Sequence, residues 1–274
     1  VMGAAMMLNA MATGAAKTDY AATLDAAALQ GKRIGVLRGA QGSSPLIKDS
    51  FEQALSDMES AGAILVDIDD IDMPDGFWGK SFDVLKYEFK ATLNAYLAST
   101  PDTVTTRTLA DLIAFNAEHA DIELALFNQD IFEQSEGMED LESDGYKEAV
   151  AFVQSATREN GIDRLLAEHD VIALVAPSGP LAPRADPVNG DVWPDWAGAG
   201  YAAAIAGYPH LTVPMGTVRG IPIGLSIMGG KDQDAAILSL GYAYEQRTQA
   251  RAEPQYYQTA EDLPEIAEAM RRRD

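Results

Sequence analysis

The chain has 274 residues, with 42 Asp or Glu, 20 Lys or Arg and no Cys. The formal net charge of −22 disfavours a nucleic-acid or anionic-membrane partner, because a polyanion would repel this surface. The lack of cysteine excludes disulfides and cysteine-ligated zinc or iron–sulfur sites. Hydrophobic residues make up 47% of the chain, enough for a sizeable core in one large domain or two small ones.

The opening segment, residues 1–16, is apolar and carries methionines at helical spacing, but no capping residue precedes its first turn. It lacks the positive start of a signal peptide and is shorter than the ~20 residues that span a bilayer. We therefore expect a chain that begins inside a helix, as a fragment or processed product would. We expect it in the cytoplasm, with the periplasm as the alternative compartment.

The first regular unit reads strand, helix, strand. Residues 32–39 form a compact apolar run bounded by glycines, and Ala63–Asp69 is a second apolar run. Between them, Phe51 to Gly62 follow helical spacing. This order is the sequence form of a right-handed crossover between two parallel strands.

Residues 77–166 change character and predict a helical insert with acidic loops. Trp78–Leu97 reads as one helix with an apolar face. Two or three further helices are expected over Asp111–Phe132 and Tyr146–Leu166, separated by the acidic stretch Glu133–Asp144.

The last third returns to strand patterns. Residues 170–179 predict a strand, and the prolines that follow predict a long irregular loop. Ala197–Ala206 predicts a helix ended by Gly207. His210–Val218 and Ile221–Met228 predict two strands joined by a tight turn at Arg219-Gly220.

The C-terminal part of the chain predicts a helix and a tail. Asp232 is expected to cap a last helix that runs through Tyr244, and Arg271–Arg273 are expected to form a solvated, frayed end.

Motifs for common chemistries are lacking in the sequence. Ser178 follows a strand but lies outside any Gly-x-Ser-x-Gly motif, so we expect a loop turn there rather than a nucleophile. His169 is expected to end a helix and His210 to open a strand, and no His-x-x-x-His pair predicts a metal site. Neither Gly-x-Gly-x-x-Gly nor a phosphate loop occurs, so no nucleotide or other cofactor is expected.

The long loop 181–201 is the strongest candidate site from the residues alone. It combines charged, amide and tryptophan side chains: Arg184, Asn189, Asp191, Trp193 and Trp196. Long irregular loops in compact domains often carry function, and exposed tryptophans are costly. The equally weighted alternative is that the tryptophans close one edge of the core.

Several motifs resemble one known family. The most specific are residues 206–216 (AGYPHLTVPMG), 220–230 (GIPIGLSIMGG) and 243–246 (AYEQ). Residues 11–14, 29–39 and 186–191 resemble the same family in the same order. Together they resemble the amidase-signature enzymes over nearly the whole chain. The resemblance implies a large mixed-sheet α/β/α fold, with residues 1–274 as a single partial amidase domain, an insert at about 77–166 and the C-terminal signature at 206–247.

The resemblance also implies hydrolysis of a carboxamide through an acyl-enzyme, in which a Lys acts through a cis-configured Ser on a nucleophilic Ser. The Gly/Ser-rich signature that holds these residues lies upstream in family members. Here the sole Ser-Ser pair, Ser43-Ser44, stands before a proline. We therefore expect no catalytic residue in this chain, which should be inactive alone. The resemblance places candidate substrate contacts on the loop and the helix beside the family's cleft: Asn189, Asp191, Trp193 and Tyr201.

Two other functions stay open. An amidotransferase of the tRNA-dependent branch of the family would act on glutamine, but the Arg-Tyr-Gly element usual in that branch is lacking from this sequence. The second open alternative is a non-catalytic binding module derived from the same fold. Expected partners are a small-molecule amide and the missing N-terminal catalytic half. A homodimer is a further expectation, because the isolated chain would expose a sheet edge and apolar surface.

Overall fold

The computed structural model describes residues 1–274 except 15–16, 184–185, 187, 191–193, 260–261 and 271–274. It is a mixed α/β structure with a five-stranded sheet in the order β2-β1-β3-β5-β4. The strands are β1 (Arg33–Leu37), β2 (Ile64–Ile68), β3 (Ala173–Pro177), β4 (His210–Val218) and β5 (Ile221–Met228).

The helices are α1 (Met2–Met11), α2 (Pro45–Ser60), α3 (Phe77–Ala98), α4 (Leu109–Glu118), α5 (Ala120–Glu123), α6 (Asp130–Glu136), α7 (Asp144–Thr157), α8 (Asp163–Glu168), α9 (Gly200–Ala206), α10 (Asp234–Thr248) and α11 (Pro264–Met270). Short 3-10 turns lie at Ala21–Thr23 and Gly39–Gln41, and a π-helical turn spans Arg158–Ile162.

The sheet mixes parallel and antiparallel pairs. Strand β1 pairs in parallel with β2 and with β3, whereas β5 runs antiparallel to both β3 and β4. Helix α2 connects β1 to β2, so the predicted parallel crossover is confirmed. The predicted hairpin is also confirmed, and its turn residues Arg219 and Gly220 have φ values of 49° and 77°. Two successive positive φ angles match the right-handed twist of the flanking strands.

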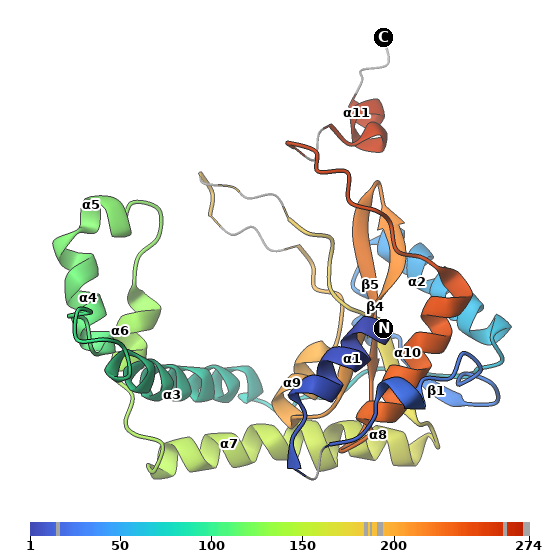
Figure 1. Ribbon diagram of the computed structural model, residues 1–274, viewed down its shortest axis with the longest axis horizontal. Coiled ribbons are helices and arrows are strands. Elements are labelled where there is room, and N and C mark those ends of the chain that lie inside the picture. The colour runs from blue at the N-terminus through green and yellow to red at the C-terminus, as the bar shows by residue number, and fades with distance from the viewer. Residues whose placement is uncertain (15–16, 184–185, 187, 191–193, 260–261, 271–274) are drawn as a thin grey trace. The chain divides into compact units, whose positions relative to one another are not determined.

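One face of the sheet packs on α2 and α10, which lie beside the long β4–β5 hairpin in Figure 1. Apolar side chains of both helices and of alternate strand positions form this core, among them Phe51, Met58, Val175, Ile227 and Ile237. The core on this face takes every second residue of each strand, because successive side chains of a strand point to opposite faces of the sheet.

The opposite face of the sheet carries α9, whose Ala202, Ala203 and Ala206 are buried. These small side chains let the helix approach the strands closely. Gly207 ends the helix with a left-handed φ of 70°, as predicted. Helices on both faces make this an α/β/α arrangement.

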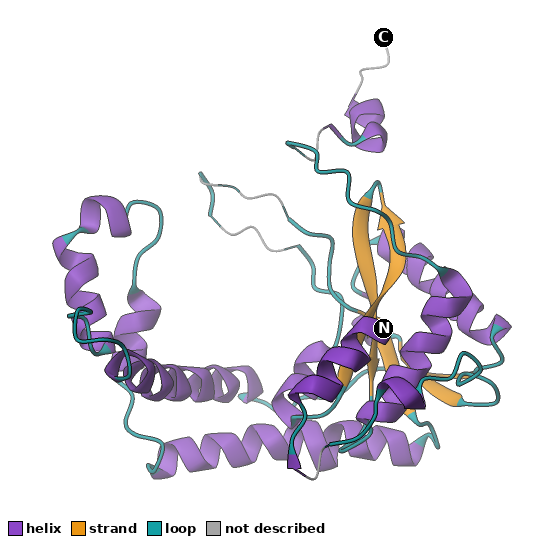
Figure 2. Cartoon of the chain, viewed as in Figure 1, coloured by secondary structure: helices purple, strands orange, loops and turns teal. Residues whose placement is uncertain are grey.

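The chain divides into two compact units, residues 1–72 with 157–274, and residues 73–156. Among the described residues every strand lies in the first unit, whereas residues 73–156 contain helices and loops (Figure 2). In the second unit α3 contacts α4 and α6, and a capping box between Thr108 and Asp111 starts α4.

The structure corrects several predicted boundaries. Residues 111–132 are divided among three helices, and α4 starts earlier than predicted because the Thr108 capping box fixes its first turn. Residues 146–166 are interrupted at Gly161, whose φ of −112° and ψ of −106° are not helical.

The expected Asp232 cap is wrong, because Gln233 occupies the N-cap of α10 and Asp232 has a left-handed φ of 62°. The tail prediction for residues 271–273 lies outside the described residues. Among the helices that the structure describes, none combines the length and apolar character needed to span a membrane.

Candidate functional site

The carboxyl ends of the parallel strands β1, β2 and β3 meet at one edge of the sheet. In open α/β sheets this edge is where ligands usually bind. Gly39 follows β1, and its N–H donates to the carbonyl oxygen of Asp69, which follows β2. A Cβ at Gly39 would lie 2.7 Å from that oxygen, so glycine allows the two segments to meet. The sequence thus brings the loops after β1 and β2 together at this edge.

Residues 194–199 fold onto the same edge. The N–H of Ser43 donates to Asp195 Oδ2 at 2.6 Å, and the N–H of Gly198 donates to the carbonyl of Ala40 at 2.7 Å. The Ser43 bonds hold the pKa of Asp195 below its usual range. Gly198 has a φ of 111° and approaches the carbonyl of Pro177 at the end of β3. The second half of the candidate loop is therefore anchored to the sheet edge.

Tyr201, a predicted substrate contact, stands in the first turn of α9 just beyond this anchored segment. Its side chain is partly buried, and burial raises the pKa of the phenol to about 12, with a smaller contribution from the negative charge of Asp70. The phenol therefore stays protonated at neutral pH and can donate or accept a hydrogen bond.

A chain of hydrogen-bonded side chains crosses β3, β5 and β4 on the face that carries α9. His210 Nε2 lies 2.7 Å from Ser226 Oγ, Ser226 donates to Ser178 Oγ at 3.0 Å, and Ser178 donates to Thr212 Oγ1 at 3.2 Å. Ser226 is fully buried, whereas Thr212 is exposed. This series of hydrogen bonds therefore connects the buried hydroxyl of Ser226 to the solvent-exposed hydroxyl of Thr212.

The imidazole of His210 lies against Gly200, where an added Cβ would be 2.5 Å from the ring's Cε1. Although the residue as a whole is exposed, this contact removes water from the ring, and burial lowers its pKa below the ordinary 6.5. His210 is therefore neutral at neutral pH. Because Ser226 donates its one proton to Ser178, the ring donates from Nε2 to Ser226 in this arrangement.

This arrangement offers neutral hydrogen-bonding groups. The exposed hydroxyl of Thr212, which accepts from Ser178, can contact an uncharged polar group such as an amide. Within the described part of the chain, no group of three or more His, Cys, Asp or Glu could hold a metal ion.

The predicted site residues are only partly brought together. Tyr201 lies at the sheet edge, but the amide of Asn189 donates to Asp186 Oδ2 at 2.7 Å within its own turn. Asp191 and Trp193 lie outside the described residues. Trp196, on the anchored segment, is 55% exposed.

The sequence predicts a loop turn at Ser178, but the backbone of Ser178 is paired with β5. Its N–H donates to the carbonyl of Gly224 at 2.7 Å and continues the ladder between β3 and β5. Sequence reasoning also missed Thr212 and Ser226. The sequence signal for Thr212 and Ser226 is that each is a polar residue within an apolar strand. The strand alternation places the two side chains on one face of the sheet.

Comparisons with known proteins place the chain in a family. Residues 5–238 match the family model described as Amidase. A probable amidase of Arabidopsis thaliana is 29% identical over 86% of this chain and 42% of the relative. A glutamyl-tRNA(Gln) amidotransferase component of Acinetobacter baylyi is 26% identical over 84% of this chain and 47% of the relative.

Solved structures agree with this placement. The native peptide amidase of Stenotrophomonas maltophilia is 37% identical with a TM-score of 0.76, over 90% of this chain and 49% of that chain. The chain thus spans about half the length of the relatives that it matches. With a family model matched over most of its residues, the chain belongs to the amidase-signature family.

Proposed function

We propose that the complete protein hydrolyses the C–N bond of a carboxamide and that this chain forms the substrate side of the site. The observation that carries the proposal is the likeness to a peptide amidase, 37% identical over 90% of this chain. A peptide carboxamide is accordingly the first substrate class to test. The neutral hydroxyls and phenol at the sheet edge support it, because an amide is an uncharged ligand with one acceptor and one donor group.

The mechanism that we propose follows the family pattern. A Lys takes a proton through a cis-configured Ser from a second Ser, which attacks the amide carbon and forms a tetrahedral oxyanion. Collapse releases ammonia, which carries the transferred proton, and leaves an acyl-Ser ester. Water then hydrolyses this ester to the carboxylic acid and restores the serine. We propose that these three residues lie upstream of residue 1, so that this chain alone is inactive.

Within this chain we propose that Tyr201 contacts the substrate, together with Asn189, Asp191 and Trp193 of the loop. Tyr201 is the best supported of the four, because it keeps its proton and lies at the carboxyl edge of the sheet. Removing its hydroxyl should weaken substrate binding more than it slows the chemical step.

Ammonia release by the complete protein from a peptide carboxamide tests the proposal. We expect release from the carboxamide and none from this chain alone, and Tyr201→Phe should raise KM several-fold with kcat nearly unchanged. Tyr256→Phe is the matched control, because Tyr256 is 90% exposed. A complete protein that releases no ammonia from any amide contradicts the proposal and leaves the non-catalytic module.

The amidotransferase alternative has one specific observation in its favour, the 26% identical relative from a glutamyl-tRNA(Gln) amidotransferase. Free glutamine in the same assay separates the two functions. Release from glutamine that depends on tRNA and on further protein components, without release from peptide carboxamides, would favour the amidotransferase.

A further inference from the structure

Few polar side chains are buried in the part of the chain that the structure describes. They are Gln41, Ser135, Thr157, Ser226 and Ser239. Buried polar groups in folded proteins nearly always have a hydrogen-bond partner, because an unpaired group loses its bonds to water and gains none in return. Each of these residues can therefore be asked which group it binds.

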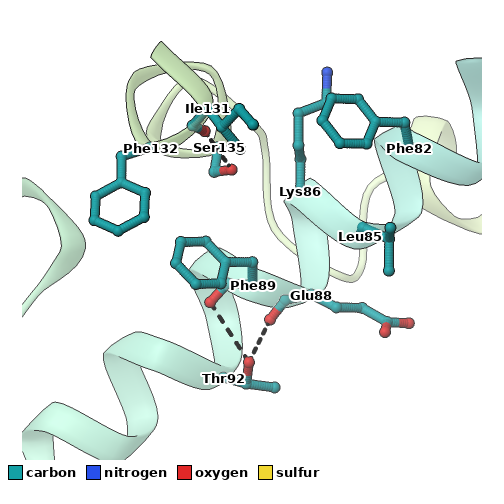
Figure 3. Close-up of a pocket in the computed structure, with 9 residues that line it drawn as sticks. All are labelled: Phe82, Leu85, Lys86, Glu88, Phe89, Thr92, Ile131, Phe132 and Ser135. Carbon is teal, nitrogen blue, oxygen red and sulfur yellow. Dashed lines mark hydrogen bonds between the residues drawn. The ribbon is translucent and has the colours of Figure 1, made fainter. Parts of the chain in front are cut away.

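The serines and the threonine of this set bind groups of the protein itself. Ser135 Oγ donates to the carbonyl of Ile131 at 2.7 Å (Figure 3). Ser239 Oγ accepts from the N–H of Asp25 at 3.0 Å. The other two also have partners, Ser226 and Thr157. These buried hydroxyls are explained by the fold alone.

Gln41 differs from them. It is 8% exposed, and its side-chain amide makes no hydrogen bond with the part of the chain that the structure describes. Among the described residues, the side-chain atoms that are fully enclosed and unpaired belong to Gln129 and Glu136, so the Gln41 amide keeps contact with solvent. The stem of Gln41 is therefore packed in the protein, while its amide can still bind a ligand.

Gln41 lies at the carboxyl edge of the sheet, where it ends the 3-10 turn that follows β1. The residue before it is fixed, because the carbonyl of Ala40 accepts from the N–H of Gly198 at 2.7 Å. The residue after it is also closely packed, since a Cβ at Gly42 would lie 3.1 Å from the Cβ of Ala197. The backbone thus holds Gln41 at the edge of the sheet where ligands usually bind.

Other amide side chains of the chain show what a structural role requires. Gln233 Oε1 accepts from the N–H of Gly230 at 2.8 Å, and Asn94 Oδ1 accepts from the N–H of Leu109 at 2.8 Å. Each of these amides binds a backbone group that would otherwise lack this partner. Gln41 has no such contact, so the fold alone does not explain a buried amide at this position.

The chemistry of an unpaired primary amide selects its ligand. Its N–H donor and its carbonyl acceptor lie side by side in one plane, so it can form two parallel hydrogen bonds with another primary amide. A trans peptide bond has its N–H and C=O on opposite sides and can form only one of the two. A carboxylate or an ester has no donor. The best complement is therefore a primary carboxamide.

We infer that Gln41 binds the scissile primary carboxamide of the substrate. Its Nε2 donates to the carbonyl oxygen, and its Oε1 accepts from the amide N–H. Both bonds lie in the plane of the carboxamide, so the two faces of the carbonyl carbon stay open to a nucleophile. The inference rests on the proposed function and names the residue that distinguishes a primary carboxamide from an ester or an N-substituted amide.

Urea unfolding of this chain tests whether Gln41 lacks an internal partner. Gln41→Met keeps the size of the side chain and removes the amide, and we expect the urea midpoint to be unchanged or higher. Gln233→Met is the comparison, because it leaves the N–H of Gly230 without its partner and should lower the midpoint. A fall in Gln41→Met as large as that in Gln233→Met would overturn the inference.

Kinetics of the complete protein test the role in specificity. A peptide carboxamide and the methyl ester of the same peptide are compared by release of their common acid product. We expect Gln41→Met to lower kcat/KM at least about tenfold for the carboxamide, chiefly through KM, and at most about threefold for the ester. Gln53→Met is the matched control, because Gln53 is exposed on α2, and it should change neither value.

The outcomes separate this inference from the proposed function. Equal losses for carboxamide and ester would indicate a structural role of Gln41, and unchanged kinetics would indicate no contact with substrate. Either result overturns the inference and leaves the proposed amidase activity in place. If the unaltered complete protein hydrolyses neither compound, the proposed function is contradicted, and this inference falls with it.

Discussion

His210 Nε2 lies 2.7 Å from Ser226 Oγ, although the strand partner of Ser226 is Thr212 and the partner of His210 is Met228. The imidazole therefore reaches diagonally across the β4–β5 ladder. A register shift between Pro214 and Gly216 makes this contact possible. Without that shift, Thr212 would lie opposite Ile227, and the polar residues of the two strands would not share a face.

The neutral state of His210 predicts a pH-dependent stability. Burial lowers the pKa of the folded imidazole below 6.5, so the unfolded chain binds a proton that the folded chain does not. This contribution to the free energy of unfolding is complete above pH 6.5 and falls as the pH drops from 6.5 toward the folded pKa.

Urea titrations at several pH values would measure this fall in the unfolding free energy. In His210→Gln, whose amide can still donate to Ser226, we expect a smaller fall. An equal fall in both proteins would show that other groups cause it.

Ser226 should contribute more to stability than Ser178. Ser226→Ala removes the buried partner of the imidazole, and we expect a loss of about 1–3 kcal/mol in the free energy of unfolding. Ser178 is only partly buried, so water can replace its hydroxyl, and Ser178→Ala should cost less than about 1 kcal/mol. Denaturant unfolding of both variants gives the comparison, and the reverse order would refute the role of the buried hydroxyl.

Gly241 of α10 should not tolerate alanine, even though alanine favours helices. An added Cβ would overlap Leu211 Cδ2 of β4, and we expect a loss of about 1–3 kcal/mol in unfolding free energy. Gly3→Ala in α1 is the control, because no heavy atom lies within 4 Å of the added Cβ, and it should be neutral or stabilising.

Leu211→Ala should relieve the penalty at Gly241, since it removes the overlapping atom. Thermal or denaturant unfolding of the double variant checks this, and equal losses from Gly241→Ala in both backgrounds would argue against the overlap.

The sequence predicts the β4–β5 hairpin well because local chemistry determines it. Arg219 and Gly220 form the tight turn, and the alternation on both sides defines the strands. The register is harder to predict, since counting back from the turn places Thr212 opposite the wrong residue. Pro214 and Gly216 are the signal of the irregularity, because a proline lacks an N–H and Gly216 has a φ of 115°.

The candidate site was harder to predict than the fold, since its residues come from separate segments. Ser178 reads as a turn from its neighbouring proline and glycine, and only the pairing with β5 shows its role. Tyr201 was predicted as a substrate contact from the family resemblance alone, and that role stays a prediction for a residue in the first turn of α9. The family resemblance did not predict that the backbone N–H and the side-chain amide of Asn189 both donate to Asp186 within one turn.

The most direct test of the account is labelling of the complete protein with a serine-directed fluorophosphonate, followed by peptide mapping by mass spectrometry. We predict a single labelled serine upstream of residue 1, and no label when this chain is treated alone. Label on Ser178, or on any other serine of this chain, would contradict the proposed catalytic arrangement. A complete protein that takes no label would contradict an acyl-enzyme amidase altogether.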